Sequence, residues 1–311
     1  MTRPPSSALV GSLCYLVCSV FWGLNIPLSS TLLTAFDPFW LPTCRYVIAS
    51  AALGAWVAAT LGPHQLLSPI PLVRVAGLSL LVSGFLLLFN LGLLHSHPLT
   101  AAAVIAGSPV YVAVVMRTMT GARLAPGFWT ATAMTLVGAG IAVYGRAEAG
   151  GGGSGPSLQG GEAFLVGSIV CWTVYSILAQ RWFRPEVPQL RRTWLTSLGA
   201  IPWLFAAWGA ARATGLAPAP NLSPDAGMFA NLVVSAVVCT SLATVAWNVG
   251  VARLGIAVGG MWQNTVPVFA VLISLVGYGV VPTLSQVLGG AVVLAGVAWM
   301  QWRSLRAAAS A

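Results

Sequence analysis

Near the middle of the chain stands GGGGSGPS, from Gly150 to Ser157, with a long hydrophobic stretch on each side. A run so rich in glycine and serine forms neither a stable helix nor a packed core, so it is typical of a flexible linker. We therefore expect a first unit at 1–147, a linker at 148–160 on the outer side of a membrane, and a second unit at 161–311.

The composition indicates that the solvent of this chain is lipid. Of its 311 residues, 58% are hydrophobic and only 6% are charged, whereas soluble domains carry about 25% charged residues. The net charge of +9 comes from arginines scattered between apolar segments, which does not resemble a phosphate-binding patch. The five cysteines show no metal or disulfide spacing. We expect no nucleic-acid partner, no metal and no cofactor.

Ten apolar segments are long enough to cross a membrane, which takes about 20 residues in a helix. They lie at 8–29, 39–61, 72–94, 98–119, 124–145, 161–182, 192–210, 228–250, 256–279 and 283–302. The sequence therefore predicts an all-α integral membrane protein of ten transmembrane helices.

The arginines favour one orientation of these helices. If the N-terminus lies inside, most arginines fall on the inner side, and only Arg45, Arg146 and Arg212 fall outside. Cytoplasmic loops carry the basic excess, so we expect both termini in the cytoplasm. The chain has arginine but no lysine, which favours a bacterial source and a multi-pass protein of the bacterial cytoplasmic (inner) membrane.

The two halves share residues at constant offsets, of 150 residues in their first helices and 158 residues further on. The matched pairs are Gly11 and Gly161, Trp22 and Trp172, Ser83 and Ser241, Asn90 and Asn248, Pro109 and Pro267, Gly121 and Gly279, and Gly138 and Gly296. Because each half holds five helices, tandem copies enter the membrane from opposite sides. This predicts an inverted repeat with a site near the midplane; the alternative is two related halves with no pathway between them.

Several motifs, taken in order, resemble those of the drug/metabolite transporter superfamily, in its EamA-type ten-helix branch. They are FWGLN at 21–25, Pro42 with Arg45-Tyr46, the Asn-x-Gly of Asn90, SPV at 108–110, and GG-x5-G at 289–296. The resemblance covers residues 8–302 and is greatest to bacterial exporters of amino acids and related metabolites, including the YddG-type aromatic amino acid exporters. It implies a central cavity lined mainly by helices 1, 3, 4, 6, 8 and 9.

Charged residues are absent from the middle of the apolar segments, and Arg45 and Arg117 lie close to segment ends. A phosphorylated substrate favours a buried cation, and a lipophilic cation favours a buried carboxylate. We therefore expect a neutral or zwitterionic substrate, and facilitated export or exchange rather than proton coupling through a membrane carboxylate.

Neutral polar and aromatic residues at helical spacing form the predicted binding faces. The predicted substrate-binding residues are Trp22, Asn25, Ser83, Asn90, Tyr111, Trp172, Tyr175, Thr244, Asn248, Trp262 and Gln263. Amides and hydroxyls are costly in lipid and should face inward, and aromatic rings suit an amphipathic ligand. Helix–helix hydrogen bonding is the open alternative for the serines and asparagines, and packing against outer loops is the alternative for Trp262 and Gln263.

Pro109 and Pro267 are predicted to bend their helices at equivalent points, because proline removes a backbone donor. Such bends could serve as gating hinges; the alternative is static packing of a bent helix.

His95 and His97 lie beside Pro98 at the outer end of the third segment. A pH-sensing role for His95 and a merely solvated loop histidine both stay open.

These patterns predict a membrane transporter that exports small neutral or zwitterionic amphipathic metabolites, aromatic or large hydrophobic amino acids foremost, by alternating access at a midplane cavity. A broad drug or nucleobase exporter of the same superfamily is the alternative. No nucleophile–base pair or nucleotide loop is present, so we do not expect an enzyme. The expected partners are a small-molecule substrate and the lipid bilayer, and we expect a monomer or weak dimer.

Overall fold

The computed structural model of the chain describes residues 5–67, 71–96, 98–121, 124, 127–148, 158–279 and 281–309. Every regular element in these ranges is a helix. Most of the linker predicted at 148–160 lies outside the described residues, as do His97 and Arg123.

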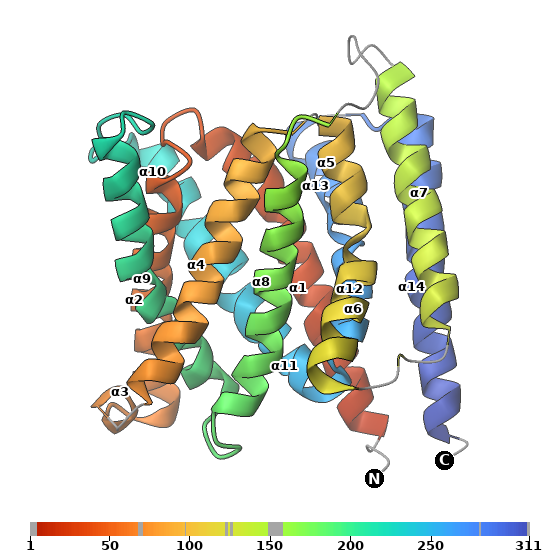
Figure 1. Cartoon of the computed structure of the whole chain (residues 1–311), viewed down its shortest axis with the longest axis horizontal. Helices are drawn as coiled ribbons and strands as arrows, with labels where there is room; N and C mark the ends of the chain where they lie inside the picture. The colour runs from red at the N-terminus through yellow and green to blue at the C-terminus, as the bar shows by residue number, and fades with distance from the viewer. Residues whose placement is uncertain are drawn as a thin grey trace.

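The helices run side by side as one bundle (Figure 1). They are α1 (Pro5–Leu32), α2 (Trp40–Leu61), α3 (His64–Leu67), α4 (Leu72–Leu94), α5 (Pro98–Ala106), α6 (Ser108–Thr120), α7 (Phe128–Glu148), α8 (Glu162–Trp182), α9 (Gln189–Ala213), α10 (Ala226–Val234), the π-helix η1 (Ser235–Leu242), α11 (Ala243–Leu254), α12 (Ile256–Gln263), α13 (Val266–Tyr278) and α14 (Leu284–Ala309). They occupy the segments that the apolar pattern predicts. The segments 98–119, 228–250 and 256–279 are each divided between two or more elements.

Six spans are long and apolar enough to cross a membrane. They are Ser7–Leu32, Trp40–Leu61, Leu72–Leu94, Glu162–Trp182, Ala226–Leu254 and Ile256–Gly277. Phe128–Ala142 and Leu284–Met300 are shorter apolar helices. Large apolar side chains are also exposed on the outside of the bundle, for example Val276, which is 88% exposed. Such a surface is unfavourable in water but suits contact with lipid.

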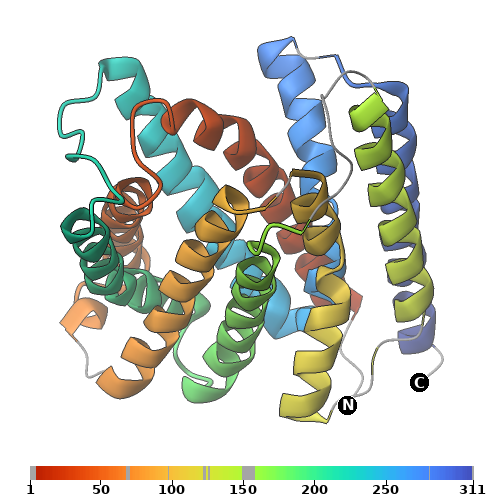
Figure 2. The same cartoon turned by 45° about the horizontal axis from the view of Figure 1, so that its top comes forward.

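The bundle places α7 and α14 together at one edge and α2 and α9 at the opposite edge (Figures 1 and 2). Between these edges lie α1, α4, α8 and α11. The first turn of α1 and the last turn of α14 lie at the same end of the bundle (Figure 1).

Interhelix hydrogen bonds of the first half recur in the second. The Ser83 hydroxyl on α4 donates to the carbonyl oxygen of Ala200 on α9, at 3.3 Å. The Ser241 hydroxyl on η1 donates to the carbonyl oxygen of Ala49 on α2, at 3.2 Å. Ser83 and Ser241 are matched positions in the two halves. Each half therefore contacts the other half through the equivalent serine.

Close glycine contacts recur in the same way. An ideal Cβ on Gly92 of α4 would lie 2.6 Å from Cγ of Leu165 on α8. One on Gly250 of α11 would lie 2.6 Å from Cε1 of Tyr15 on α1. Gly92 and Gly250 stand at the offset of 158 residues, and Tyr15 and Leu165 at the offset of 150. Helices α4 and α11 therefore approach their partners closely where only glycine fits.

The α7–α14 pair is built from two further matched glycines. Gly138 of α7 approaches the backbone of Gly289 on α14, and Gly296 of α14 approaches the carbonyl oxygen of Ala131 on α7. Gly296 and Gly289 lie 158 residues after Gly138 and Ala131 respectively. The two contacts are therefore equivalent: a glycine of α7 packs against the α14 backbone, and the matched glycine of α14 packs against the α7 backbone.

Candidate substrate site

Five aromatic side chains meet at the centre of the bundle, and we call them the aromatic cluster: Trp22, Phe85, Trp172, Tyr175 and Trp247. The three tryptophan rings lie mutually close, with centroid distances of 5.6 Å for Trp22–Trp172, 5.4 Å for Trp22–Trp247 and 5.7 Å for Trp172–Trp247. Phe85 and Tyr175 lie 5.0 Å and 5.2 Å from Trp172. These distances are typical of aromatic pairs. The cluster joins α1, α4, α8 and α11.

The cluster contains a hydrogen-bond donor without an acceptor. Trp172 is only 5% exposed, and its indole Nε1 has no hydrogen-bond partner in the described part of the chain. By contrast, Nε1 of Trp247 donates to the Ser176 hydroxyl at 3.0 Å. An unpaired buried donor costs about 1–3 kcal/mol. A ligand that offers an acceptor to Trp172 would remove this cost.

A buried polar network supports one side of the cluster. Asn248 Nδ2 donates to the Tyr175 hydroxyl at 3.1 Å and to the Thr193 hydroxyl at 2.9 Å. The hydroxyls of Tyr175 and Thr196 share a further bond of 3.3 Å. This network fixes α8, α9 and α11 to one another. Asn248 Oδ1 is buried and has no partner among the residues described, so it is an acceptor that remains available.

The polar face predicted on α4 makes contacts to other elements. Ser83 donates to the Ala200 carbonyl of α9, and Asn90 Nδ2 donates to the Pro38 carbonyl in the α1–α2 connection at 2.8 Å. Ser79, one turn before Ser83, likewise donates to α9. The bonds of Ser79 and Ser83 are helix–helix contacts, which was the open alternative for this face, whereas Asn90 bonds to a connection.

Asn25 is tied to an element that sequence reasoning missed, the π-helix η1. The Ser235 hydroxyl at the start of η1 donates to Asn25 Oδ1 at 2.8 Å. Within η1 the Thr240 hydroxyl donates to the Ser235 carbonyl at 3.0 Å, five residues back. π-Helical turns are often found at functional sites. In the sequence Thr240 follows Ser235 by five residues, the spacing of this π-helical contact. The same residues also fit an α-helix, so the spacing alone does not predict a π-helix.

Both proline-bearing segments are divided between two helices. The first break is at Gly107, before Pro109 in the first turn of α6; the second separates α12 from α13, where Pro267 lies in the first turn. The two breaks meet, because the Ser108 hydroxyl donates to Asn264 Oδ1 at 3.4 Å. Asn264 Nδ2 is buried without a partner in the described ranges.

The remaining predicted residues surround this region less tightly. Tyr111, Thr244 and Gln263 are half-buried on α6, α11 and α12. Trp262 is half-buried and packs on the same apolar core as the aromatic cluster. Its Nε1 is a second buried indole donor that lacks an acceptor within the described residues. His95 is exposed where α4 ends.

Arg45 corrects the expectation that the membrane interior lacks a buried cation. It is the sixth residue of α2, near a segment end as predicted, but it is only 9% exposed. One terminal nitrogen, Nη2, donates to the Ser29 hydroxyl at 2.9 Å, and Nε has no partner in the described residues. Position along a segment predicts depth in the membrane. Burial depends also on the neighbouring helices, which the segment itself does not reveal.

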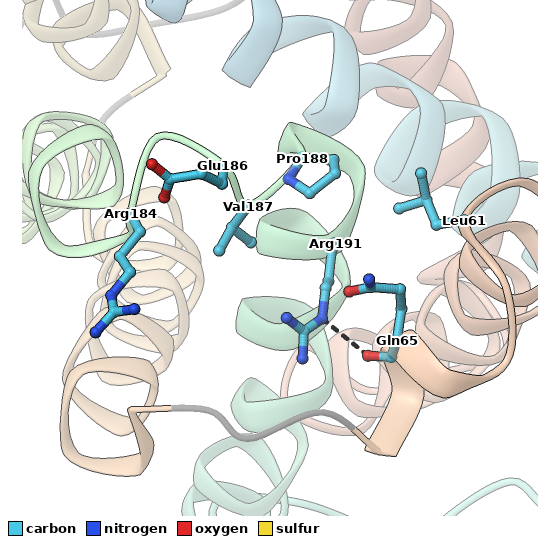
Figure 3. A pocket seen from close by; sticks show the side chains of 7 residues that line it. All are labelled: Leu61, Gln65, Arg184, Glu186, Val187, Pro188 and Arg191. Atoms are coloured by element: carbon cyan, nitrogen blue, oxygen red, sulfur yellow. Dashed lines mark hydrogen bonds between the residues drawn. The ribbon is translucent and has the colours of Figure 1, made fainter.

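A separate pocket of about 480 Å³ lies at the end of the bundle that holds α3 and the ends of α1 and α14. Its lining comes from the end of α2, from α3, from the α8–α9 connection and from the first turn of α9: Leu61, Gln65, Arg184, Glu186, Val187, Pro188 and Arg191 (Figure 3). Arg191 Nε donates to the Gln65 carbonyl at 2.8 Å. That bond joins α9 to α3. No predicted substrate residue lines this pocket.

The described side chains offer no metal centre: no three His, Cys, Asp or Glu residues gather among them. The apolar helices, with aromatic and polar groups buried between them, define a multi-pass membrane protein. The chain belongs to the EamA-like transporter family, whose model matches residues 9–144 and again residues 159–302. This assignment places it in the drug/metabolite transporter superfamily.

Two relatives agree with this assignment. A Bacillus subtilis (strain 168) protein named Uncharacterized transporter YyaM is 24% identical over 286 residues, which cover 90% of this chain and 89% of the relative. A protein of Streptantibioticus cattleyicolor named Probable terminal-alkyne amino-acid exporter is 26% identical over 300 residues, covering 92% and 91%. Both are named as transporters, in line with the expectation that this chain is not an enzyme.

Among solved structures, one crystal structure superposes with a TM-score of 0.75 over 98% of this chain and 99% of that chain. Its sequence identity to this chain is 22%, so the likeness shows the fold alone.

Proposed function

We propose that this protein exports amino acids with aromatic or large hydrophobic side chains across the cytoplasmic membrane of a bacterium. The observation that carries the proposal is the central aromatic cluster with the unpaired buried indole N–H of Trp172. Aromatic faces favour an apolar side chain, and a lone donor favours a polar group on the same molecule. The Streptantibioticus relative, named a probable terminal-alkyne amino-acid exporter, supports the amino-acid part of the proposal.

The proposed topology has ten membrane crossings. The helix pairs α5–α6 and α12–α13 each form one crossing, and α10, η1 and α11 together form another. The common end of α1 and α14 in Figure 1 supports an even number of crossings. The arginine distribution supports the assignment of that end to the cytoplasm.

The halves are proposed to form an inverted repeat, divided by the linker at 148–160. The recurring serine and glycine contacts support it, as do the two separate family matches. Trp22 and Trp172 are matched positions and touch each other. Equivalent residues of a two-fold repeat meet only near its axis, so the aromatic cluster would lie between the halves, where such transporters bind substrate.

Within this site, the cluster would hold the substrate side chain, with Trp172 and Trp262 offering N–H donors and Asn248 an acceptor. Ser83 and Asn90 would position helices around the site, because their donors already bond to the backbone. The breaks before Pro109 and Pro267 would be the hinges that expose the site to each side in turn.

The proposal is tested by flux in proteoliposomes. The purified protein is reconstituted, and uptake of labelled Phe, Tyr, Trp, Leu and Met is measured with and without a proton gradient. Saturable, stereospecific flux that is indifferent to the gradient is expected. Flux of nucleobases or dyes without amino-acid flux would instead favour the broad drug or nucleobase exporter. A requirement for the gradient would contradict facilitated transport.

A further inference from the structure

We infer that Arg45 binds the carboxylate of the transported amino acid, an inference that rests on the proposed function and deepens it. The starting observation is a buried guanidinium with an unused donor. Arg45 is 9% exposed, and its Nε has no acceptor in the described parts of the chain. Its Nη2 donates to the neutral hydroxyl of Ser29, at 2.9 Å.

The charge of Arg45 has no evident counterion. A guanidinium carries five N–H donors and stays protonated, so burial leaves it with a charge to offset and donors to satisfy. The hydroxyl of Ser29 accepts one of these donors but carries no charge. Among the described residues no carboxylate accepts a hydrogen bond from Arg45. An anion from outside the chain would satisfy both needs.

The geometry of the free donors fits a carboxylate. Nη2 carries two N–H bonds, and Ser29 needs only one of them. Nε and Nη2 together can therefore donate to the two oxygens of one carboxylate, the bidentate arrangement that arginine favours. A single lysine ammonium could not offer this planar pair of donors.

Arg45 also lies at a distance from the aromatic cluster that suits the length of an amino acid. Its partner Ser29 follows Trp22 by seven residues on α1, which places both on one face of the helix. At a rise of about 1.5 Å per residue, the two positions are about 10 Å apart along the axis. Asn25 stands between them and is held by Ser235 of η1. This span is comparable with an extended amino acid whose side chain touches Trp22.

An acceptor for the substrate ammonium lies on the same helix. Pro27 is inside α1 and has no N–H, so the carbonyl oxygen of Gly23 lacks its usual intrahelical donor. That carbonyl points along α1 toward Pro27, between the levels of Trp22 and Ser29, so it offers an acceptor to the ammonium of a zwitterion whose carboxylate meets Arg45.

The test compares a carboxylate with the corresponding amide. Dissociation constants of L-phenylalanine and L-phenylalaninamide are measured by titration calorimetry for the wild type and for Arg45→Gln in detergent. The wild type is expected to prefer the acid. Arg45→Gln should weaken binding of the acid by about 10- to 100-fold, the loss of one charge-assisted contact, and should leave the amide nearly unchanged.

Two further variants separate recognition from folding. Ser29→Ala removes the partner of Arg45 but keeps its charge, so it should retain the preference for the acid. Arg212→Gln alters an exposed arginine on α9 and should also retain it. Loss of the preference in Ser29→Ala, or equal weakening of acid and amide in Arg45→Gln, would assign Arg45 a structural role and overturn the inference.

The inference and the proposed function fail in different ways. If wild type binds and transports phenylalanine and Arg45→Gln binds the acid equally well, the carboxylate site is wrong and the exporter stands. If wild type neither binds nor transports any amino acid of the panel, the proposed function is wrong and the inference falls with it. If chloride at the titration concentrations competes with phenylalanine in wild type but not in Arg45→Gln, the anion site is supported.

Discussion

Replacing Gly250 by alanine should destabilise the protein, because α11 packs there directly on α1. An ideal Cβ on Gly250 would lie 2.6 Å from Cε1 and 2.7 Å from Cδ1 of Tyr15. The Tyr15 ring has little room to move. It is 1% exposed, its centroid lies 5.4 Å from that of Trp247, and its hydroxyl donates to the Gly255 carbonyl at 2.8 Å.

The magnitude follows from two opposing effects. One extra methyl group in a well-packed core costs about 1–3 kcal/mol, and alanine in place of a helical glycine recovers about 1 kcal/mol. Gly140 of α7 is the matched control, because nothing lies within 4 Å of its ideal Cβ. The helix-propensity gain is common to both variants. Gly250→Ala and Gly140→Ala should therefore differ by the packing cost alone, about 1–3 kcal/mol.

The assay is thermal unfolding of the purified variants in one detergent, followed by tryptophan fluorescence. Gly250→Ala should unfold at a lower temperature than the wild type, and Gly140→Ala at the same or a higher temperature. Gly92→Ala should behave like Gly250→Ala, since its Cβ would meet Leu165 at 2.6 Å. If Gly250→Ala matches Gly140→Ala, the close approach of α1 and α11 is wrong.

Two further predictions concern the polar network and the helix breaks. Asn248→Ala removes the donors to Tyr175 and Thr193, and we expect a loss of about 1–3 kcal/mol in the same unfolding assay; an unchanged midpoint would show that these bonds contribute nothing. Pro267→Ala restores a backbone donor at the start of α13 and should lower the maximal flux in proteoliposomes without changing KM. Equal maximal flux would contradict a hinge at this break.

The helical framework could be predicted because its signals are local. Apolar runs of membrane length coincide with the helices, and Pro109 and Pro267 each lie in the first turn of the helix that follows a break. Trp22 and Trp172 were predicted separately, as matched positions and as substrate-binding residues, and their rings lie together in the cluster. Such features depend on composition and residue spacing, and both can be read from a single sequence.

Other features depend on which helices become neighbours, and these were not predicted. Trp247 was not among the predicted substrate-binding residues, yet its ring completes the aromatic cluster. The burial of Arg45 arises from its contact with Ser29 on another helix. The π-helix η1 differs from an α-helix only in backbone pairing, which side-chain periodicity does not distinguish. Long-range packing decides all three.

Solute counterflow in proteoliposomes tests the central claim most directly. Vesicles loaded with unlabelled phenylalanine are diluted into labelled phenylalanine, and accumulation is compared for the wild type, Trp172→Ala and Trp129→Ala, the last altering a tryptophan that is 59% exposed. The wild type and Trp129→Ala should accumulate label transiently and saturably, and Trp172→Ala should not. Equal counterflow by all three proteins would show that the substrate does not pass through the aromatic cluster.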